Sequence, residues 1–322
     1  MGLLQTCMAS GSRVAPGLFG RLGFHLFGYP PSGLRGTVET AWRGKLPSEA
    51  VRTLRRARQL RIPVEDGDVL AYDIAPATTG RPGVSDAPGT VAVVHGWGSR
   101  AAFMVPLAKD LLASGKRCIL IDLPAHGAAG GQTINMLVAA KALRAVEAQT
   151  GPWEAIVGHS FGGGAAVLAV SDLLDDTPAI AVDRLVLVAA PDSIRGVFER
   201  AGAAFGLNAR AIDVMCQCGS RVAGRSIDDF SLSAAAGRSA ISTLVLHAPE
   251  DKEVPFTDAL AYSAHETIAL HEMPGAGHRR IVFSGDARKA VTRFICEPQE
   301  SRLQEGKSQA SWLQDGKSGS SD

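Results

Sequence analysis

The feature that most constrains the fold of this chain is a serine between two glycines, in the run Gly158-His159-Ser160-Phe161-Gly162. An apolar run, Trp153 to Val157, precedes it and is typical of a strand buried in a parallel sheet, and a helix-compatible stretch, Gly162 to Leu174, follows it. A serine in a tight strand-to-helix turn has a strained backbone and projects its hydroxyl above the sheet. We therefore interpret Ser160 as a nucleophile. The alternative is an ordinary glycine-rich turn, because five-residue patterns of this kind also occur by chance.

Strand-like and helix-like segments alternate along most of the chain. Short apolar runs separated by helix-compatible stretches predict an α/β fold with a mostly parallel, doubly wound sheet. Two earlier runs, on either side of Asp66-Gly67-Asp68, indicate a hairpin and hence an antiparallel edge. The predicted strands are Ile62–Glu65, Val69–Ile74, Val91–Val94, Cys118–Leu123, Trp153–Val157, Leu185–Ala189, Thr243–His247 and Ile268–His271.

Composition and pattern divide the chain into three regions. Residues 1–60 are expected to form an N-terminal arm and one helix, and residues 61–296 the α/β domain. Between about 192 and 240 there is helix-compatible sequence and no good strand, and an insertion at the carboxyl side of a strand is placed to cover a site. We expect a small helical cap there. The polar tail, 297–322, can bury little surface and is expected to be disordered.

Charge and cysteine content limit the partners and the compartment. A formal net charge of +1, from 33 basic and 32 acidic residues, argues against nucleic acid, whose binding needs a concentrated excess of Lys and Arg. Five cysteines without a disulfide-framework spacing, and no clear secretory signal, predict free thiols in the cytoplasm. The apolar segment Leu18 to Phe27 is interpreted as packing on the domain, with contact to a membrane surface as the less favoured alternative.

A serine nucleophile needs a base and a group that orients the base. In this kind of fold the chain order is serine, then a carboxylate, then histidine. Asp251 and His278 each follow a predicted strand, so both are expected at the rim of the sheet where Ser160 also lies. Glu250 is the alternative carboxylate, and a solvated surface position is the alternative for either acid. The other histidines are interpreted as structural or surface residues.

A developing oxyanion needs backbone N–H donors. The N–H of Phe161 begins the helix after the serine and points toward the reaction site. A second donor is expected from the loop after an early strand, here His95-Gly96-Trp97-Gly98-Ser99, and we assign it to the N–H of Trp97. His95 is expected to brace this loop.

Taken together these segments resemble the α/β-hydrolase family. His95-Gly96-Trp97-Gly98 is similar to its oxyanion segment, and Asp122-Leu123-Pro124-Ala125-His126-Gly127 to its Asp-x-Pro-Gly-His-Gly turn, with Ala125 in place of the usual glycine. The run Gly277-His278-Arg279-Arg280-Ile281 resembles compact bacterial serine hydrolases with a His-Gly-Trp loop. The resemblance covers roughly residues 62–296. It implies hydrolysis of an ester, thioester or amide without a metal or organic cofactor.

Three functional hypotheses follow. The first is a serine hydrolase that cleaves a carboxylic ester or thioester of a small-molecule acyl substrate through an acyl-enzyme on Ser160. The second is a serine peptidase or amidase, and the third a hydrolase fold retained as a non-catalytic binding module. Serine at position 160 disfavours dehalogenase and epoxide-hydrolase chemistry, which need a carboxylate there. Phe198, Phe205 and Met215 are predicted to line the substrate pocket, with packing inside the cap as the alternative.

Overall fold

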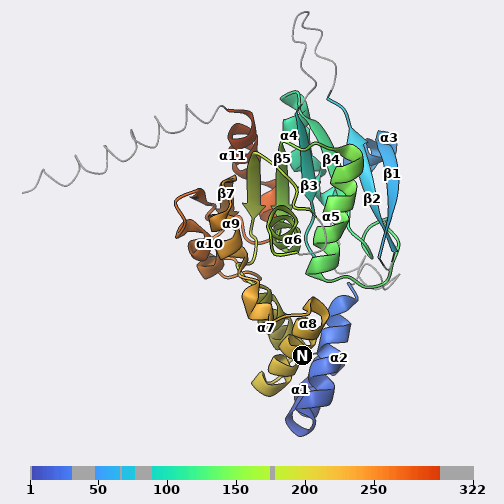
Figure 1. Cartoon of the computed structure of the whole chain (residues 1–322), viewed down its shortest axis with the longest axis vertical. Helices are drawn as coiled ribbons and strands as arrows, with labels where there is room; N and C mark the ends of the chain where they lie inside the picture. Colours follow the sequence, from blue (N-terminus) through green and yellow to red (C-terminus); the bar gives the residue numbers. More distant parts are fainter. Residues whose placement is uncertain (1, 31–47, 66, 77–88, 175–177, 298–322) are drawn as a thin grey trace, which may run out of the picture.

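The structure is a computed structural model and describes residues 2–30, 48–65, 67–76, 89–174 and 178–297 (Figure 1). The predicted disordered tail lies outside the described residues apart from Glu297. The helices are α1 (Leu3–Val14), α2 (Pro16–Gly28), α3 (Ser48–Arg56), α4 (Val105–Ala113), α5 (Met136–Thr150), α6 (Phe161–Val170), α7 (Ile194–Phe205), α8 (Ala209–Ala223), α9 (Leu232–Arg238), α10 (Phe256–Ser263) and α11 (Gly285–Cys296).

An eight-stranded sheet forms the centre of the molecule, in the order β1-β2-β4-β3-β5-β6-β7-β8. The pairs β1–β2 and β2–β4 are antiparallel and all other pairs are parallel, which confirms the predicted doubly wound sheet with an antiparallel edge. The strands are β1 (Arg58–Val64), β2 (Gly67–Ile74), β3 (Thr90–Val94), β4 (Arg117–Asp122), β5 (Ala155–His159), β6 (Arg184–Val188), β7 (Ser242–His247) and β8 (Ile268–Glu272).

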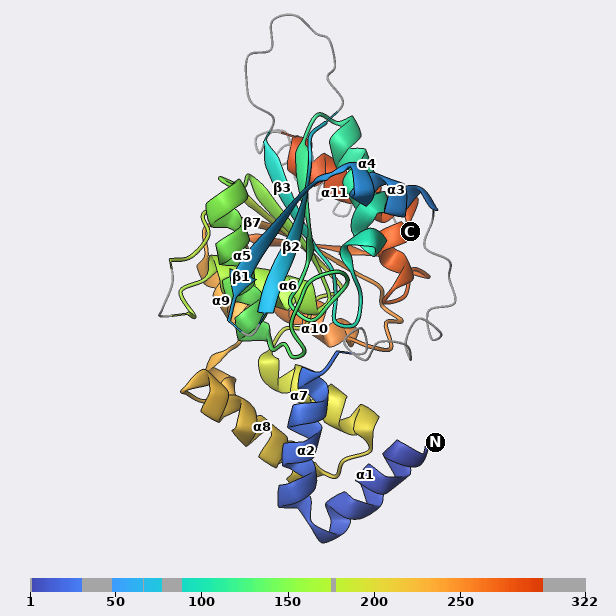
Figure 2. The same cartoon turned by 90° about the vertical axis from the view of Figure 1, so that its right-hand side faces the viewer.

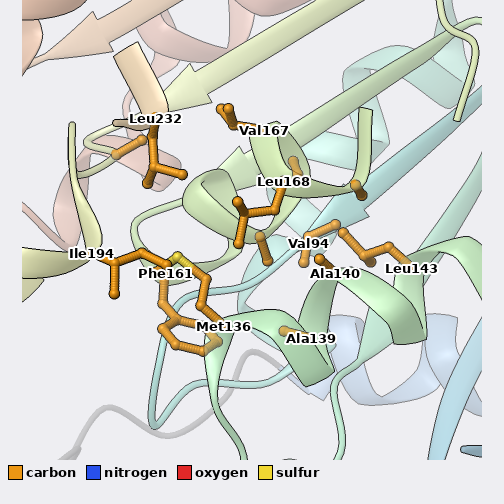
Figure 3. Packing of buried hydrophobic residues seen from close by; sticks show 14 of the residues in the cluster. Val94, Met136, Ala139, Ala140, Leu143, Phe161, Val167, Leu168, Ile194 and Leu232 are labelled. Carbon is orange, nitrogen blue, oxygen red and sulfur yellow. The ribbon is translucent and has the colours of Figure 1, made fainter. Parts of the chain in front are cut away.

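Helices cover both faces of the sheet, with α5, α6 and α9 on one side and α3, α4 and α11 on the other (Figure 2). Every residue of the central strands β3 and β5 is buried, because each face of these strands meets a helix layer. Burying one valine, leucine or isoleucine side chain contributes about 1.5–3 kcal/mol. Figure 3 shows one such layer, where side chains of α5 and α6 meet the sheet: Val94, Met136, Ala139, Ala140, Leu143, Phe161 and Leu168.

The first region differs from the prediction of an arm and one helix. Residues 1–60 contain α1, α2 and α3, and β1 already begins at Arg58, so the expected boundary at residue 60 falls inside a strand. The strand extends this far because Arg58 pairs with Asp73 near the end of β2. The polar Arg58 and Gln59 are exposed at the edge of the sheet, which is why alternation of apolar residues did not reveal them.

Helices α1 and α2 pack on α7 and α8, and we call these helices together the cap lobe (Figure 1). Helix α2 lies against α8 at its small residues: a Cβ atom added at Gly20 would be 2.3 Å from the carbonyl oxygen of Ala211. Asn208, which caps the start of α8, donates from its side chain to the carbonyl of Ser12 at the end of α1 (2.8 Å). The N-terminal segment is therefore part of the cap.

The predicted cap insertion, residues 192–240, does not lie entirely in the cap lobe. Helices α7 and α8 lie in the cap lobe, and α8 continues to Ala223. Helix α9 lies on the α/β domain instead of the cap lobe, because Leu232 is buried in the core beside α6 (Figure 3). The outer side of α2 carries the exposed Leu18 and Leu22, so contact of this segment with a membrane surface stays a prediction. The described helices include none that is long and apolar enough to cross a bilayer.

Candidate active site

Ser160 occupies the turn between β5 and α6 in a conformation that L-residues rarely adopt, with φ 52° and ψ −121°. The neighbouring backbone is so close that only glycine fits beside it. A Cβ atom at Gly162 would be 2.3 Å from the carbonyl oxygen of His95, and one at Gly158 would be 2.6 Å from the Cα of Gly163. The strained turn, held by packing on both sides, presents the hydroxyl at the carboxyl edge of the sheet.

The three side chains predicted to act together form one hydrogen-bonded chain. The Ser160 Oγ lies 3.0 Å from His278 Nε2, and His278 Nδ1 lies 2.8 Å from Asp251 Oδ2. They come from loops after β5, β8 and β7, which meet because the carboxyl ends of parallel strands lie at one edge of the sheet. The alternative acid, Glu250, instead accepts from the backbone N–H of Gly277 (3.0 Å) and so supports the histidine loop.

Asp251 is held as a carboxylate that orients the histidine. Burial raises the pKa of this carboxyl, but the hydrogen bond from His278 and the N–H groups of Val254 and Glu253 outweigh burial, and the net pKa lies below its ordinary value. The charged Asp251 accepts a hydrogen bond from His278 Nδ1–H, which keeps the proton on that nitrogen. The lone pair on His278 Nε2 is then free to accept the proton of the Ser160 hydroxyl.

Buried histidines surround this chain of groups and fix its loops. His159 Nε2 donates to the carbonyl of His278 (2.9 Å), and burial, with His278 nearby, lowers the pKa of His159 to about 3. His247 Nε2 donates to the carbonyl of Val254 (2.9 Å) in the acid loop, and burial also lowers the pKa of His247. These neutral rings hold the backbone on both sides of the acid and the base.

The loop after β3 carries the predicted second N–H donor, Trp97. His95 Nδ1 donates to the carbonyl of Gly96 (2.8 Å), and His126 Nε2 accepts from the N–H of Gly98 (2.9 Å). Gly96 lets the loop approach Ser160, since a Cβ at Gly96 would be 3.1 Å from the Ser160 Cβ. Burial lowers the pKa of His95 to about 4 and of His126 to about 3, so both rings are neutral braces.

The first N–H of α6 belongs to Phe161 and has no acceptor within the helix. Phe161 and Trp97 both line the pocket beside Ser160. That the N–H groups of these two residues bind an oxyanion stays a prediction.

The turn after β4 shows how the chain departs from the family pattern. Asp122 is buried and accepts from the N–H groups of Ala101 (2.6 Å) and Ala128 (2.9 Å) and from the Tyr72 hydroxyl (3.0 Å). Ala125 adopts φ 62°, a left-handed conformation that glycine enters without a steric penalty. The alanine is accommodated because the surrounding turn is tied down by Asp122.

Ser160 and His278 open into a pocket of about 680 Å³ between the sheet edge and the cap lobe. Of the predicted pocket residues, Phe205 lines it. Phe198 does not: it packs against Phe24 and Phe27 of α2, with ring centroids 5.7 and 5.8 Å away, beside a separate cavity of about 40 Å³. Met215 is fully buried beside Gly23 and lines neither cavity. The prediction failed for these two residues because α2 covers the apolar face of the cap that they occupy.

Several lining residues were not predicted, and Phe27 and Arg200 are two of them. Phe27 of α2 stacks on Trp97, with ring centroids 5.5 Å apart and planes 15° apart, and lines the pocket. Arg200 of α7 also lines it. The only sequence signal for Phe27 was the apolar segment Leu18 to Phe27, which does not reveal its contact. Among the described residues no group of three or more His, Cys, Asp or Glu could hold a metal ion.

A sheet of this topology with a serine, a histidine and an aspartate at its carboxyl edge defines the α/β-hydrolase class of protein. The alpha/beta hydrolase family model matches residues 91–293, and the chain belongs to this family. No curated protein matches the chain in sequence.

Solved structures share the fold at low identity. An esterase from Exiguobacterium antarcticum is 17% identical over 74% of this chain and 98% of its own, with a TM-score of 0.52. Est1E from Butyrivibrio proteoclasticus, solved with ferulic acid, is 18% identical over 76% and 98%, with a TM-score of 0.57. A bromoperoxidase from Bacillus anthracis is 17% identical over 74% and 100%, with a TM-score of 0.54. These likenesses concern the fold.

Proposed function

We propose that this protein is a serine hydrolase that cleaves a carboxylic ester or thioester through an acyl-enzyme on Ser160. The observation that carries the proposal is the continuous hydrogen-bonded chain from Ser160 through His278 to Asp251 at the floor of the pocket. A hydroxyl is a poor nucleophile at neutral pH unless an oriented base takes its proton. The chain of groups supplies both the base and its orienting carboxylate.

The reaction proceeds in two halves. His278 takes the proton as Ser160 Oγ attacks the acyl carbon, and then gives it to the leaving alcohol or thiol as the acyl-enzyme forms. A water molecule then gives a proton to the same histidine as it attacks the acyl carbon. The bond between the acyl carbon and Ser160 Oγ breaks, His278 returns the proton to Oγ, and the acid leaves. The N–H groups of Trp97 and Phe161 stabilise the oxyanion in both halves, and losing one such donor costs about 100- to 1,000-fold in turnover.

An aminopeptidase-like activity is less well supported. Recognition of a free amine needs an available carboxylate, but the two carboxylates that line the pocket are engaged. Asp251 bonds to His278, and Glu253 pairs with Arg279 (2.7 Å). In the cap, Glu199 pairs with Arg195 at 3.8 Å and does not line the pocket. Ester and thioester substrates need no such carboxylate.

Active-site labelling tests the proposal. A fluorophosphonate probe should modify Ser160 in the folded protein, and labelling should vanish in Ser160→Ala and persist in Ser114→Ala, a matched change at an exposed serine after α4. Para-nitrophenyl acetate should be hydrolysed by the wild type and by Ser114→Ala only. A folded wild type that neither labels nor turns over any activated ester or thioester would favour the non-catalytic binding module.

We also propose that the protein works in the cytoplasm. Its five cysteines are all free thiols in the structure, as expected in a reducing compartment. Cell fractionation tests this, and recovery of the protein outside the cytoplasmic fraction would contradict it.

A further inference from the structure

The charged residues that line the pocket do not balance. The carboxylates are Asp251 and Glu253, and both are already engaged, by His278 and by Arg279. Lys252 lines the pocket and has no ion pair within the part of the chain that the structure describes. Besides Lys252, the lining cations are Arg279, which pairs with Glu253, and Arg200 on the cap helix α7, whose carboxylate partner is not a lining residue. The pocket therefore presents an excess of positive charge.

Arg200 is held in place on one side only. Its Nη1 lies 3.2 Å from Asp258 Oδ2 on α10, an oxygen that also accepts from the N–H of Asp192 (3.2 Å). Gly196 leaves room for the guanidinium, because a Cβ there would be 3.0 Å from Arg200 Nη1. Nη2 is buried and has no hydrogen-bond acceptor among the described residues. The guanidinium is thus oriented by one carboxylate and leaves donors unused.

The anchoring carboxylate, Asp258, is itself buried. Burial raises the pKa of Asp258 to about 6, even though the positive charge of Arg200 lowers it. An arginine keeps its charge throughout this pH range. A buried guanidinium nitrogen without an acceptor, such as Arg200 Nη2, is unfavourable, and a planar oxyanion is the ligand that matches guanidinium donors.

We propose that Arg200 forms an anion subsite and that the substrate is an ester or thioester carrying a second, free carboxylate. This inference rests on the proposed function, since it names the substrate class of the same pocket. The free carboxylate accepts from the Arg200 guanidinium under α7 while the reacting carbonyl lies at Ser160. Lys252 at the exposed rim adds attraction for the anion.

A purely structural role for Arg200 is the competing explanation, in which its ion pair with Asp258 ties the cap lobe to α10. The two explanations differ in substrate dependence. Loss of a structural tie affects neutral and anionic substrates alike. Loss of an anion subsite affects only the substrate that carries the second carboxylate, mainly through KM, and lysine at position 200 restores part of the effect.

The kinetic test uses the full chain with two matched substrates, the mono-para-nitrophenyl ester of adipic acid and para-nitrophenyl hexanoate. The wild type should prefer the adipate by about tenfold or more in kcat/KM. Arg200→Gln should lose about 10- to 100-fold on the adipate, the range expected for a hydrogen bond to a charged group, with hexanoate nearly unchanged. Arg200→Lys should fall between. Equal losses on both substrates, or no preference in the wild type, would overturn the proposal.

Two variants separate the explanations further. Arg195→Gln, on the same helix but outside the pocket lining and paired with Asp228, should leave both substrates unchanged. Asp258→Asn removes the charge of this ion pair but keeps an amide oxygen that can accept from Arg200 Nη1. We expect it to keep or increase the preference for adipate. If Asp258→Asn and Arg200→Gln instead change the kinetics of both substrates identically, Arg200 acts only through its ion pair with Asp258, and the anion subsite is rejected.

A binding measurement keeps this inference distinct from the proposed function. Adipate dianion should raise the thermal unfolding midpoint of the wild type and of Ser160→Ala, but not that of Arg200→Gln, whereas hexanoate should not discriminate between them. If adipate stabilises the protein but no ester is turned over, the anion subsite is supported and the proposed hydrolase function is rejected. If esters are turned over but adipate does not stabilise the protein, the hydrolase function is supported and the anion subsite is rejected.

Discussion

The loops at the carboxyl edge of the sheet and the cap lobe face each other across one pocket, yet they are held by different forces. In the edge loops, polar side chains are buried and hydrogen-bonded to backbone groups, as His159 is to the carbonyl of His278. In the cap lobe, α2 packs on α8 at Gly20 and Gly23, and a side-chain hydrogen bond from Asn208 to the carbonyl of Ser12 joins α8 to α1. Hydrogen bonds fix atoms in direction as well as distance, whereas apolar packing tolerates sliding. The candidate reacting groups thus lie where directional hydrogen bonds hold the surrounding backbone.

The largest expected effect compares a variant that should lose activity with one that should lose stability. His278→Ala should lower kcat/KM for para-nitrophenyl acetate by about a thousandfold or more, because the base is lost, with little change in the unfolding midpoint. Met215→Ala, which leaves a void inside the cap lobe, should cost about 2–5 kcal/mol in free energy of unfolding and change kcat for this small ester only slightly. Steady-state kinetics and urea unfolding check both. If Met215→Ala were as inactive as His278→Ala, packing inside the cap lobe would also determine turnover, and the contrast between the two regions would be wrong.

The second prediction concerns acid stability of the edge loops. His95, His126 and His159 have pKa values of about 4, 3 and 3 in the folded protein because of burial, against roughly 6.5 in the unfolded chain. As the pH falls below 6.5, these three histidines bind protons in the unfolded state but stay neutral in the folded state. Between pH 7 and pH 5 each ring should therefore lower the free energy of unfolding by about 2 kcal/mol.

Asp258 opposes this trend over the same interval, because its pKa is raised to about 6 and the folded state gains a proton there. Urea unfolding at pH 7 and pH 5 measures the net loss. His126→Gln, which removes one titrating ring, should reduce the loss by about 2 kcal/mol. The described cap lobe contains one histidine, the exposed His25, so the pH dependence should arise from the edge loops. Equal stability at the two pH values would contradict the assignment of neutral buried rings.

Two glycine substitutions compare close packing in the two regions. Gly162→Ala places a Cβ 2.3 Å from the His95 carbonyl oxygen, and Gly20→Ala places one 2.3 Å from the Ala211 carbonyl oxygen. Each should cost about 1–3 kcal/mol in free energy of unfolding. Gly162→Ala should also abolish fluorophosphonate labelling, because it displaces the turn that presents Ser160. Gly20→Ala should retain labelling, since α2 can shift along α8. Loss of labelling in both variants would show that the cap lobe is as rigid as the edge loops.

A smaller effect is expected at the contact between the two regions. Phe27→Ala removes the ring that stacks on Trp97 and enlarges the pocket. We expect KM for para-nitrophenyl hexanoate to change by about 3- to 10-fold, in line with a stacking contribution of about 0.5–1.5 kcal/mol, and kcat to change less. Phe27→Tyr, which keeps the ring, should behave like the wild type. A large fall in kcat would mean that Phe27 also positions the N–H of Trp97.

The smallest effect tests the departure from the family pattern. Ala125→Gly removes a Cβ at φ 62° and should raise the free energy of unfolding by about 1 kcal/mol without changing turnover. Chemical denaturation of the two proteins measures the difference. A destabilised glycine variant would mean that the alanine side chain, which is buried, contributes more by packing than the left-handed backbone costs.

Much of the fold and of the candidate site could be predicted because the signals are local. The strand before Ser160, the glycines around it and the helix after it occupy one continuous segment. Asp251 and His278 each follow a predicted strand, and parallel strands bring their carboxyl ends to one edge. The braces His126, His159 and His247 could not be assigned partners from sequence, because each partner lies in another segment of the chain or on the far side of a loop.

By itself the sequence determined the doubly wound sheet and the loops that carry Ser160, Asp251 and His278, since apolar periodicity and strand-end loops are local properties. Only the tertiary structure decided that α1 and α2 join the cap lobe, that Phe27 reaches Trp97 and that Met215 turns away from the pocket. It also decided that Arg200 faces the same pocket as Ser160. An apolar helix carries no local signal for which surface it will cover, because burial on any complementary face lowers the free energy by a similar amount.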